Sequence, residues 1–424
     1  MDATNGKDSN AGTTPETAWK TIQYAAGSMK AGDVVIVFPG NYDERVQVRN
    51  SGTADAPIIF QAWNSAGRAA VTHGFTIRAD HVHVLGFEVT DTVNEVDNGA
   101  GIYVEGSHCV ISGNHIYDVT RPGIFLDAKD PDSPLTSHCV IRDNIIEGAG
   151  LTGIWISGRQ HLVESNNISH TLQYPPKWVN PPPWADADGL RFFGSGHTIR
   201  KNHVHDIRLS DAGNLSPHID ALQTYGPAYE IVIEQNFFDV PDDNMQGAMI
   251  SSDNPPVRDL TIRNNVIKAF RGLNIWGEKD VILHNVHILN NTFVGNLAFN
   301  GESMYAIELH HVSDGLVANN IFYNNGNHRY PYLGEDHAIG TSSLNNCHFM
   351  SDGEPPEGRA RPGDLWQVDP QFANATADDF RLLAGSRLID AGHPLPQISN
   401  DYSGVSRPQG EGYDIGAFEN ADYP

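Results

Sequence analysis

The chain has 424 residues, and 27 lysine and arginine residues against 52 aspartate and glutamate residues give a formal net charge of −25. A surface of this sign repels nucleic acids and anionic membranes, so we expect neither as a partner. Three cysteines exclude a disulfide-dense scaffold, and no apolar run is long enough to span a membrane.

The chain begins with a polar, turn-rich segment in which Met1 directly precedes DATNGKDSNAGTTPETAWKTI. We interpret this start as a chain from which an export signal has been removed and to which a start methionine has been added. That interpretation predicts a secreted or periplasmic protein, and an ordinary cytoplasmic protein is the alternative. The pattern of residues 17–30 predicts an amphipathic helix, with a strand and a turn after it.

An internal repeat follows, in which each unit reads apolar-polar-x-Asn-x-apolar. The asparagines of the repeat are 22 to 36 residues apart, and they are Asn114, Asn144, Asn166, Asn202, Asn236, Asn265, Asn291 and Asn320. Upstream, VHVLGFEV fits the same frame with Phe87 in place of the asparagine. A unit of this length with only short strands cannot bury its own apolar face, so successive units must stack as coils around one core. An asparagine at a fixed turn suits such stacking, because its amide can bond the coils above and below and because it tolerates left-handed backbone angles.

The repeat resembles the right-handed parallel β-helix (pectate-lyase-like) carbohydrate-active proteins, although it matches no specific family among them. The resemblance implies an all-β solenoid with an N-terminal capping helix, an irregular C-terminal cap and a polysaccharide or oligosaccharide substrate. We therefore predict one domain over residues 1–424, acting as a monomer. Residues 1–74 would form the N-terminal cap and first coils, residues 75–325 the regular coils, and residues 326–424 the last coils and C-terminal cap. A β-propeller is the alternative, but its blades are longer and more even.

Each coil has a second strand about 10 residues before its asparagine. Alternation along these strands places Ile102, Ile124, Ile154, Leu190, Leu222, Leu273 and Ile307 inward. The predicted outward side chains mix aromatic and polar residues, namely Tyr103, Glu105, Phe125, Asp127, Trp155, Arg191, Phe193, Gln223, Tyr225, Asn274, Trp276, Glu308 and His310. Aromatic rings with interleaved hydrogen-bonding groups are typical of sugar-binding surfaces. The alternative is a face covered by long loops, with the rings packed beneath them.

The two longest spacings are consecutive and bracket Asp188 and Asp220, which occupy equivalent positions in adjacent coils. The first insertion is rich in proline and carries Trp178 and Trp184, and the second delivers His218. Long loops beside a regular scaffold are often functional, which predicts the site at this point.

Glycoside hydrolysis needs two carboxyl groups, and neighbouring carboxylates raise the pKa of one of them. We predict a glycoside hydrolase that needs no cofactor, with Asp188 and Asp220 as catalytic residues and Glu308 as a third candidate. The predicted substrate-binding residues are His218, Arg191, Gln223, Tyr225, Trp184, Trp178, Asn274, Trp276, Trp155, Arg271 and His310.

Two other functions remain open. A polysaccharide lyase could use His218, Tyr225 or Lys201 as base and Arg191 or Arg271 to neutralise a uronate, and the acidic cluster could bind Ca²⁺. A non-catalytic glycan-binding adhesin or tailspike-like protein is the third possibility.

Overall fold

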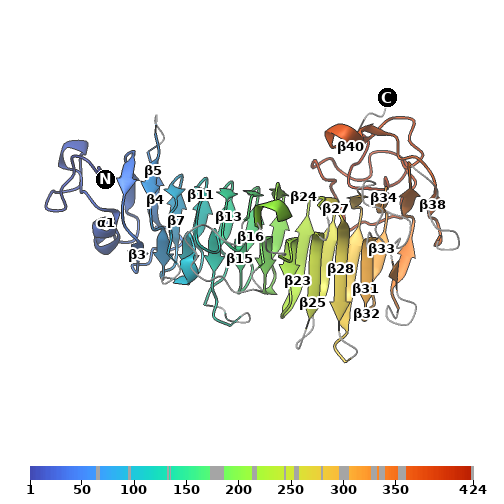
Figure 1. The fold of residues 1–424 in the computed structure, drawn as a ribbon, viewed down its shortest axis with the longest axis horizontal. Helices are drawn as coiled ribbons and strands as arrows, with labels where there is room; N and C mark the ends of the chain where they lie inside the picture. Colours follow the sequence, from blue (N-terminus) through green and yellow to red (C-terminus); the bar gives the residue numbers. More distant parts are fainter. Residues whose placement is uncertain are drawn as a thin grey trace. The chain divides into compact units, whose positions relative to one another are not determined.

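The computed structural model describes residues 1–63, 67–93, 97–130, 133, 135–171, 186–212, 217–242, 245–252, 257–277, 280–295, 305–325, 332–333, 340–351 and 360–421. The chain forms a right-handed parallel β-helix, as predicted, in which each coil contributes one strand to each of three parallel sheets (Figure 1).

Sheet A contains β1 (Val34–Val37), β4 (Ile58–Ala62), β7 (Val82–Leu85), β10 (Val110–Ser112), β13 (Val140–Arg142), β16 (Leu162–Glu164), β19 (Gly194–Ser195), β20 (Thr198–Arg200), β23 (Ala228–Glu234), β26 (Arg258–Arg263), β29 (Leu283–Leu289), β32 (Val312–Ser313), β33 (Leu316–Ala318) and β36 (Ser342–Leu344). Sheet B contains β2 (Gly40–Tyr42), β5 (Ala69–Val71), β8 (Glu88–Val89), β11 (His115–Tyr117), β14 (Ile145–Glu147), β17 (Asn167–Ser169), β21 (His203–His205), β24 (Phe237–Val240), β27 (Val266–Ala269), β30 (Thr292–Val294), β34 (Ile321–Tyr323), β37 (Cys347–Phe349) and β38 (Leu365–Trp366). Sheet C contains β3 (Val46–Val48), β6 (Phe75–Ile77), β9 (Ile102–Val104), β12 (Ile124–Leu126), β15 (Thr152–Ile156), β18 (Asp188–Phe192), β22 (Asp220–Thr224), β25 (Gln246–Ser252), β28 (Arg271–Gly277), β31 (Tyr305–His310) and β35 (Tyr332–Leu333). A separate antiparallel pair consists of β39 (Phe372–Asn374) and β40 (Asp379–Leu382).

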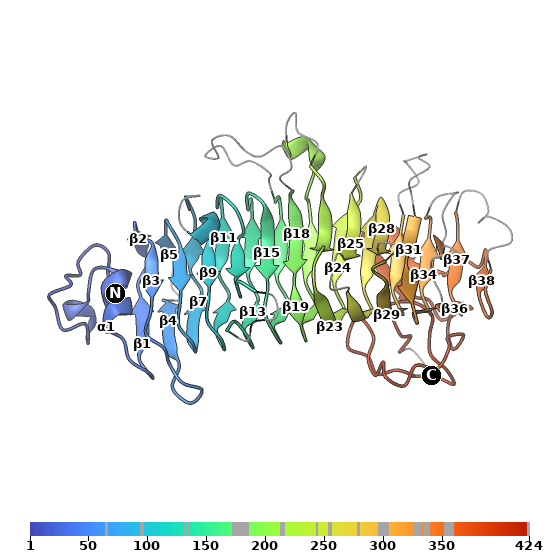
Figure 2. The ribbon, with the colours of Figure 1, turned by 90° about the horizontal axis from the view of Figure 1, so that it is seen from below.

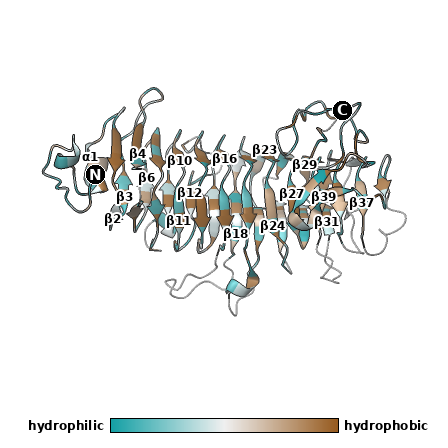
Figure 3. Cartoon of the chain, turned by 90° about the horizontal axis from the view of Figure 1, so that it is seen from above, coloured by the Kyte–Doolittle hydropathy of each residue, from teal (hydrophilic) through white to brown (hydrophobic). Residues whose placement is uncertain are grey.

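The chain divides into two compact units, Met1–His197 with His205–Ile219, and Thr198–Val204 with Asp220–Pro424. In both, the inward residues of the short strands are apolar and buried, as the alternation predicted. The hydrophobic residues appear as brown segments along the strands in Figure 3. Ile102, Ile124 and Ile154 stack in register in the first unit, and Leu222, Ala248, Leu273 and Ile307 stack in the second. Because each apolar row is shared between coils, no coil is stable alone.

The predicted asparagine ladder is confirmed within each unit. In the first, Nδ2 of Asn114 donates to Oδ1 of Asn144, and Nδ2 of Asn144 donates to Oδ1 of Asn166. In the second, the same bond links each ladder asparagine to the next, through Asn202, Asn236, Asn265, Asn291, Asn320 and Asn346. Phe87 replaces the asparagine in the coil before Asn114, and its backbone N–H donates to Oδ1 of Asn114.

The expectation of left-handed backbone at the ladder asparagines is wrong. The positive φ angles belong to the residue before each of them, namely Gly113, Asp143, Ser165, Lys201, Gln235, Asn264, Asn290, Asn319 and Asn345. The ladder residue itself has no positive φ, and its own N–H donates to the side chain of the next asparagine. The preceding residue therefore makes the turn.

The N-terminal helix is shorter than predicted, because α1 spans only Ile22–Ser28. The side chain of Thr21 caps it by accepting from the N–H of Tyr24, and Glu44 accepts from the N–H groups of Ile22 and Gln23. These bonds satisfy the first N–H groups of the helix and fix its start at residue 22. Four 3₁₀ turns lie at Pro15–Thr17, Asp97–Gly99, Leu209–Ala212 and Ala375–Ala377 in the described residues.

Several conspicuous polar residues are structural. The rings of His161 and His197 stack at 5.0 Å, and burial lowers the pKa of His197 to about 4. Cys109 and Cys139 are buried free thiols in adjacent coils, and burial together with Cys109 raises the pKa of Cys139.

Candidate active site

Most of the predicted site residues that the structure describes lie on the outer face of sheet C or beside it, where strand register arranges them in rows. In the first unit, Thr152 is the register partner of Asp188, and Trp155 is the partner of Arg191. In the second unit, one row contains Asp220, Gln246, Arg271 and Tyr305, and a second row contains Gln223, Met249, Asn274 and Glu308. A third row contains Ser251, Trp276 and His310.

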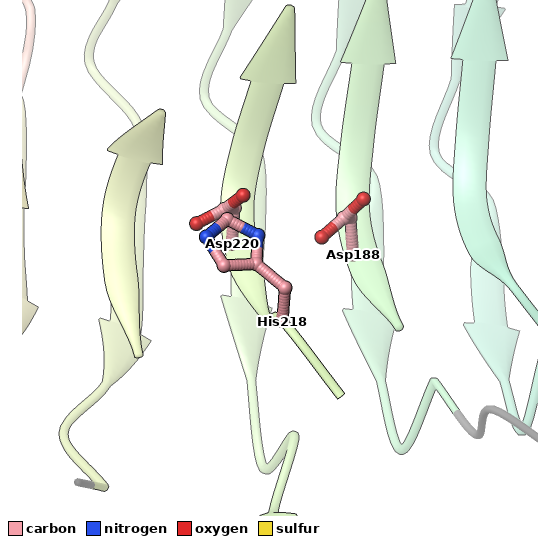
Figure 4. Close-up of side chains that lie close together, drawn as sticks. All are labelled: Asp188, His218 and Asp220. Atoms are coloured by element: carbon pink, nitrogen blue, oxygen red, sulfur yellow. The ribbon is translucent and has the colours of Figure 1, made fainter. Parts of the chain in front are cut away.

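Three side chains of this face come together at the two predicted carboxylates (Figure 4). One carboxylate oxygen of Asp188, one ring nitrogen of His218 and one carboxylate oxygen of Asp220 all lie within 4.8 Å of one another. Asp188 and Asp220 are fully buried, whereas His218 is partly exposed. Asp188 and Asp220 are the first residues of β18 and β22, and the third residue of each strand, Leu190 or Leu222, is buried in the core.

Asp188 forms an ion pair with Arg191. Nε of Arg191 donates to Oδ2 of Asp188 at 2.7 Å, and one terminal nitrogen of Arg191 lies 2.5 Å from the same oxygen. The guanidinium also pairs with Asp186 at 2.5 Å and lies over the ring of Trp155, 5.2 Å from its centroid. A guanidinium in this position stabilises the ionised form of Asp188.

Asp220 accepts a hydrogen bond from a buried amide. Nε2 of Gln223 donates to Oδ2 of Asp220 at 2.9 Å, and Gln223 is itself buried. The two carboxylates thus accept from different groups, Asp188 from a guanidinium and Asp220 from an amide.

Tyr305 and Glu308 extend the polar surface along the second unit. Burial raises the pKa of Tyr305, and the negative charge of Glu308 raises it further, so the phenol stays protonated as a hydrogen-bond donor. Glu308 lies 2.9 Å from Nε2 of His310. Glu308 thus interacts with both Tyr305 and His310, which belong to its own strand β31.

The other predicted residues divide by exposure. Trp276 is 47% exposed and Tyr225 is 40% exposed, which leaves both rings accessible to a ligand. Asn274 and Arg271 are partly exposed. Lys201 lies in the turn between β20 and β21, on the edge shared by sheets A and B rather than on sheet C. Trp178 and Trp184 lie outside the described residues.

Part of the outward face is buried. Tyr103, Phe125, Trp155 and Phe193 form a row of contacting rings with centroids 5.2 to 5.8 Å apart, and only Trp155 has more than a tenth of its surface exposed. The expected open aromatic groove is therefore replaced, over these coils, by rings packed against each other.

The sequence interpretation missed Asp186, Gln246 and Tyr305. The signal for two of them was available, because the register that aligns Asp188 with Asp220 continues to Gln246, Arg271 and Tyr305. Asp186 stands two residues before Asp188, and nothing in the repeat distinguishes it from a turn residue.

Two cavities lie elsewhere, both in the first unit. One, of about 670 Å³, is lined mainly by apolar residues that include Trp19, Val34 and Trp63. The other, of about 500 Å³, is lined by Arg78, Glu105, Asp127 and Lys129 among others. The groups of the second cavity bond one another, with Nζ of Lys129 2.7 Å from both Glu105 and Asp127, so we regard it as a structural ion network.

Asp188, His218 and Asp220 also form a possible metal site. One imidazole nitrogen with two carboxylates suits Zn²⁺ or a similar transition metal better than Ca²⁺, which takes six to eight oxygen ligands. The bond from Arg191 to Asp188 opposes metal binding, since it occupies the oxygen that a cation would take.

The family model for a right-handed β-helix region matches residues 70–173 and 185–354. The uncharacterized protein YwoF of Bacillus subtilis (strain 168) is 30% identical over 127 residues, which cover 26% of this chain and 27% of YwoF. The chain thus matches only about a quarter of the length of this curated relative.

Three solved structures share the fold at low sequence identity. The pectate lyase Pel9A is 17% identical with a TM-score of 0.59, covering 98% of this chain and 94% of its own. XylC in complex with xylose is 13% identical with a TM-score of 0.63, covering 98% of both chains. The catalytic unit of the thermostable GH87 α-1,3-glucanase from Streptomyces thermodiastaticus strain HF3-3 is 16% identical with a TM-score of 0.50, covering 81% of this chain and 64% of its own.

In the described residues, no helix has both the length and the apolar character that a membrane crossing requires. The three sheets, the ladder and the match of the family model over most of the coils agree with one another. The chain therefore belongs to the family of proteins that contain a right-handed β-helix region.

Proposed function

We propose that this protein is a carbohydrate-active enzyme that cleaves glycosidic bonds on the outer face of sheet C, by hydrolysis. The observation that carries the proposal is the pair of buried carboxylates, one bound by Arg191 and one by the amide of Gln223. Glycoside hydrolysis needs these two states together, an acid for the leaving oxygen and an anion for the anomeric carbon. The fold neighbours include enzymes whose names refer to pectate and α-1,3-glucan, which supports a polysaccharide or oligosaccharide as substrate.

In this mechanism Asp220 donates its proton to the glycosidic oxygen as the bond to the anomeric carbon breaks. Asp188, held ionised by Arg191, attacks the anomeric carbon or takes a proton from an attacking water. His218, with a ring nitrogen within 4.8 Å of an oxygen of each carboxylate, orients the sugar between them. The exposed ring of Trp276 provides a stacking surface along the same sheet.

Elimination is the second candidate, because His218 beside two carboxylates is also placed to act as a base. Arg191 is occupied by Asp186 and Asp188, so in that mechanism Arg271 would neutralise the uronate. Calcium is a possible cofactor of this second mechanism only. A glycan-binding adhesin would bind the same surface without cleaving the chain. If secreted or periplasmic, as we expect, the enzyme would meet such polymers outside the cytoplasm.

The test is to incubate the protein with neutral and uronate polysaccharides while reducing ends and the ultraviolet absorbance of unsaturated sugars are recorded. We expect reducing ends without new absorbance. Asp220→Asn should lower kcat by about 100-fold or more, since it removes the general acid, and should leave the fold intact. Asp314→Asn, at a highly exposed aspartate of the same unit, is the matched control and should leave kcat unchanged.

Absorbance that rises together with reducing ends would replace hydrolysis by elimination. Retained binding without any cleavage would identify an adhesin. Near-normal turnover by Asp220→Asn would refute its role as the acid.

A further inference from the structure

The strands that carry the two aspartates have the same layout. Asp188 and Arg191 stand at the first and fourth positions of β18, and Asp220 and Gln223 stand at the same positions of β22. In each strand the fourth residue donates to the carboxylate of the first, at 2.7 Å from Arg191 and at 2.9 Å from Gln223. One backbone position thus selects the partner of each carboxylate, a cation in one strand and a neutral amide in the other.

The amide of Gln223 uses only part of its hydrogen-bonding capacity. Gln223 is 2% exposed, and its Oε1 is buried without a hydrogen-bond partner in the described part of the chain, although Nε2 donates to Asp220. A buried carbonyl oxygen without a donor destabilises the fold. Its register partner on the next strand, Met249, has no polar hydrogen to offer. The carboxyl group of Asp220 becomes such a donor when it is protonated.

A glutamine amide can serve either protonation state of a carboxyl group. Its nitrogen donates to a carboxylate, and its oxygen accepts from the O–H of a carboxylic acid. Half a turn about the terminal side-chain bond exchanges the two atoms, and this torsion is broad and roughly two-fold. The guanidinium of Arg191 has donors only, so it stabilises Asp188 as an anion and has nothing to accept a proton from the acid.

We propose that Gln223 is a positioning residue that binds Asp220 in both of its protonation states. The proposal rests on the proposed function for the role of Asp220 as the acid. Before cleavage, Oε1 of Gln223 accepts from the O–H of Asp220. That proton passes to the glycosidic oxygen as its bond to the anomeric carbon breaks, and the amide turns so that Nε2 donates to the resulting carboxylate. The water that completes hydrolysis supplies the proton that restores the acid.

Other ionisable groups also face Asp220. In the described residues they are Asp188, His218, Arg191, Arg271 and Tyr305. An oxygen of Asp188 and a ring nitrogen of His218 lie within 4.8 Å of an oxygen of Asp220, and Arg191 binds Asp188. Arg271 and Tyr305 lie in the register row of Asp220, two and three strands away. A substitution of Gln223 leaves all of them in place, so its effect reports on the amide.

The pH dependence of kcat/KM tests the proposal, because its alkaline limb reports loss of the proton from the acid. Gln223→Met keeps the length of the side chain and removes donor and acceptor together. It should lower kcat about 10- to 100-fold, with KM little changed and the alkaline limb nearly in place, since both states lose a hydrogen bond. Gln223→Glu should move the limb to higher pH, and Gln223→Arg, which reproduces the layout of β18, should move it to lower pH.

A second readout does not depend on cleavage. In protein made with isotope-labelled glutamine, the side-chain N–H signals of Gln223 are those that Gln223→Met lacks. These signals should move as the pH carries Asp220 through its titration, and Asp220→Asn should abolish the movement. Gln61→Met, at an exposed glutamine of sheet A, is the matched control and should change neither kcat nor these signals.

The outcomes separate this proposal from the proposed function. An alkaline limb that Gln223→Met moves upward by about one pH unit or more would show that Gln223 serves only the anion, and the proposal would be overturned. Unchanged kcat in Gln223→Met, or side-chain N–H signals that ignore the titration, would overturn it as well and leave the enzyme assignment standing. Signals that follow Asp220 in a protein that cleaves no polymer would support the two-state contact and remove the enzymatic function.

Discussion

Buried charged side chains on the outside of the coils differ in what neutralises them. Asp188 has a guanidinium at 2.5 to 2.7 Å, and Asp220 has an amide at 2.9 Å. A buried charge without a counterion is costly, so the group beside each carboxylate influences its protonation state. The proposed chemistry follows from that influence rather than from the presence of the residues alone.

The ion network of the first unit provides a residue-level test by pH. Burial opposes ionisation of Glu105, but hydrogen bonds from Lys129, Tyr103 and Arg78 outweigh it and lower the pKa of Glu105 from 4.5 to about 2. A lowered pKa in the folded state stabilises the fold above the unfolded pKa, and this stabilisation is lost as the pH falls toward the folded pKa. Glu105→Gln should therefore lower the Tm at neutral pH, and its difference from the wild type should shrink between pH 4.5 and about 2.

Thermal melting followed by circular dichroism across this pH range measures the effect. Glu411→Gln, at an exposed glutamate, is the control and should show no such trend. A Tm difference for Glu105→Gln that stays constant as the pH falls would show that the ionised carboxylate does not stabilise the network.

At this scale the sequence predicted Asp188, His218 and Asp220 as neighbours, because equal positions in stacked coils must align. It could not predict Arg191 as the partner of Asp188, since the outward alternation equally allowed a substrate-binding role.

The asparagine ladder is the element that holds consecutive coils in register. Asn265 is fully buried, its Nδ2 donates to the carbonyl of Ile233 at 2.9 Å and to Oδ1 of Asn291 at 2.9 Å, and its Oδ1 accepts from the backbone of Asn236. Each ladder residue thus satisfies backbone groups that the turn would otherwise leave unpaired. The polar row is as necessary as the apolar rows beside it.

Asn265→Ala should destabilise the protein by about 3 kcal/mol or more, because it leaves several buried donors and acceptors unpaired. The midpoint of chemical denaturation measures this loss. Asn285 has a φ of 57° and makes one exposed side-chain bond to Asp259, so Asn285→Gly should change stability by only about 0.5 kcal/mol. Equal effects of the two substitutions would mean that the ladder bonds add nothing beyond the turn.

The ladder was predictable because a repeat aligns identical residues automatically. The position of the left-handed residue was not, because asparagine tolerates either conformation. The hydrogen bond from the ladder N–H to the next coil decides it, and that bond exists only once coils are stacked.

At the scale of the whole second unit, the C-terminal segment lies beside the coils of β29 to β36 (Figures 1 and 2). Leu395, Ile398 and Tyr413 pack on Leu289 and Ala318 there. Side-chain amides of turn residues donate to this segment, as Asn264 does to the carbonyl of Asn400 and Asn319 to that of His393. Asp390, Asp414 and Glu419 accept from backbone N–H groups of this segment, and Glu419 also pairs with Arg407.

The buried pair of Arg407 and Glu419 holds this segment together, with both side chains at most 1% exposed. Arg407→Met leaves the carboxylate of Glu419 uncompensated and should destabilise the segment by about 3 to 5 kcal/mol. Chemical denaturation and limited proteolysis of residues 388–420 measure the loss. Adding Glu419→Gln should restore part of it, because the unpaired charge disappears.

The control is Arg381→Met, whose pair with Asp379 is exposed and should be worth at most about 1 kcal/mol. If Arg407→Met lowered the stability no more than Arg381→Met does, the pair of Arg407 and Glu419 would not be what holds the segment together.

The sequence by itself determined the coil, its ladder and the rows of residues on each sheet, because a stacked repeat converts spacing along the chain directly into neighbours in space. It also predicted that Asp188 and Asp220 lie close together, since they occupy the same position in consecutive coils. Only the tertiary structure decided which outward side chains are buried, which charges are paired and where the C-terminal segment packs. Those features depend on contacts between side chains of different length and on non-repeating segments, for which the repeat provides no register.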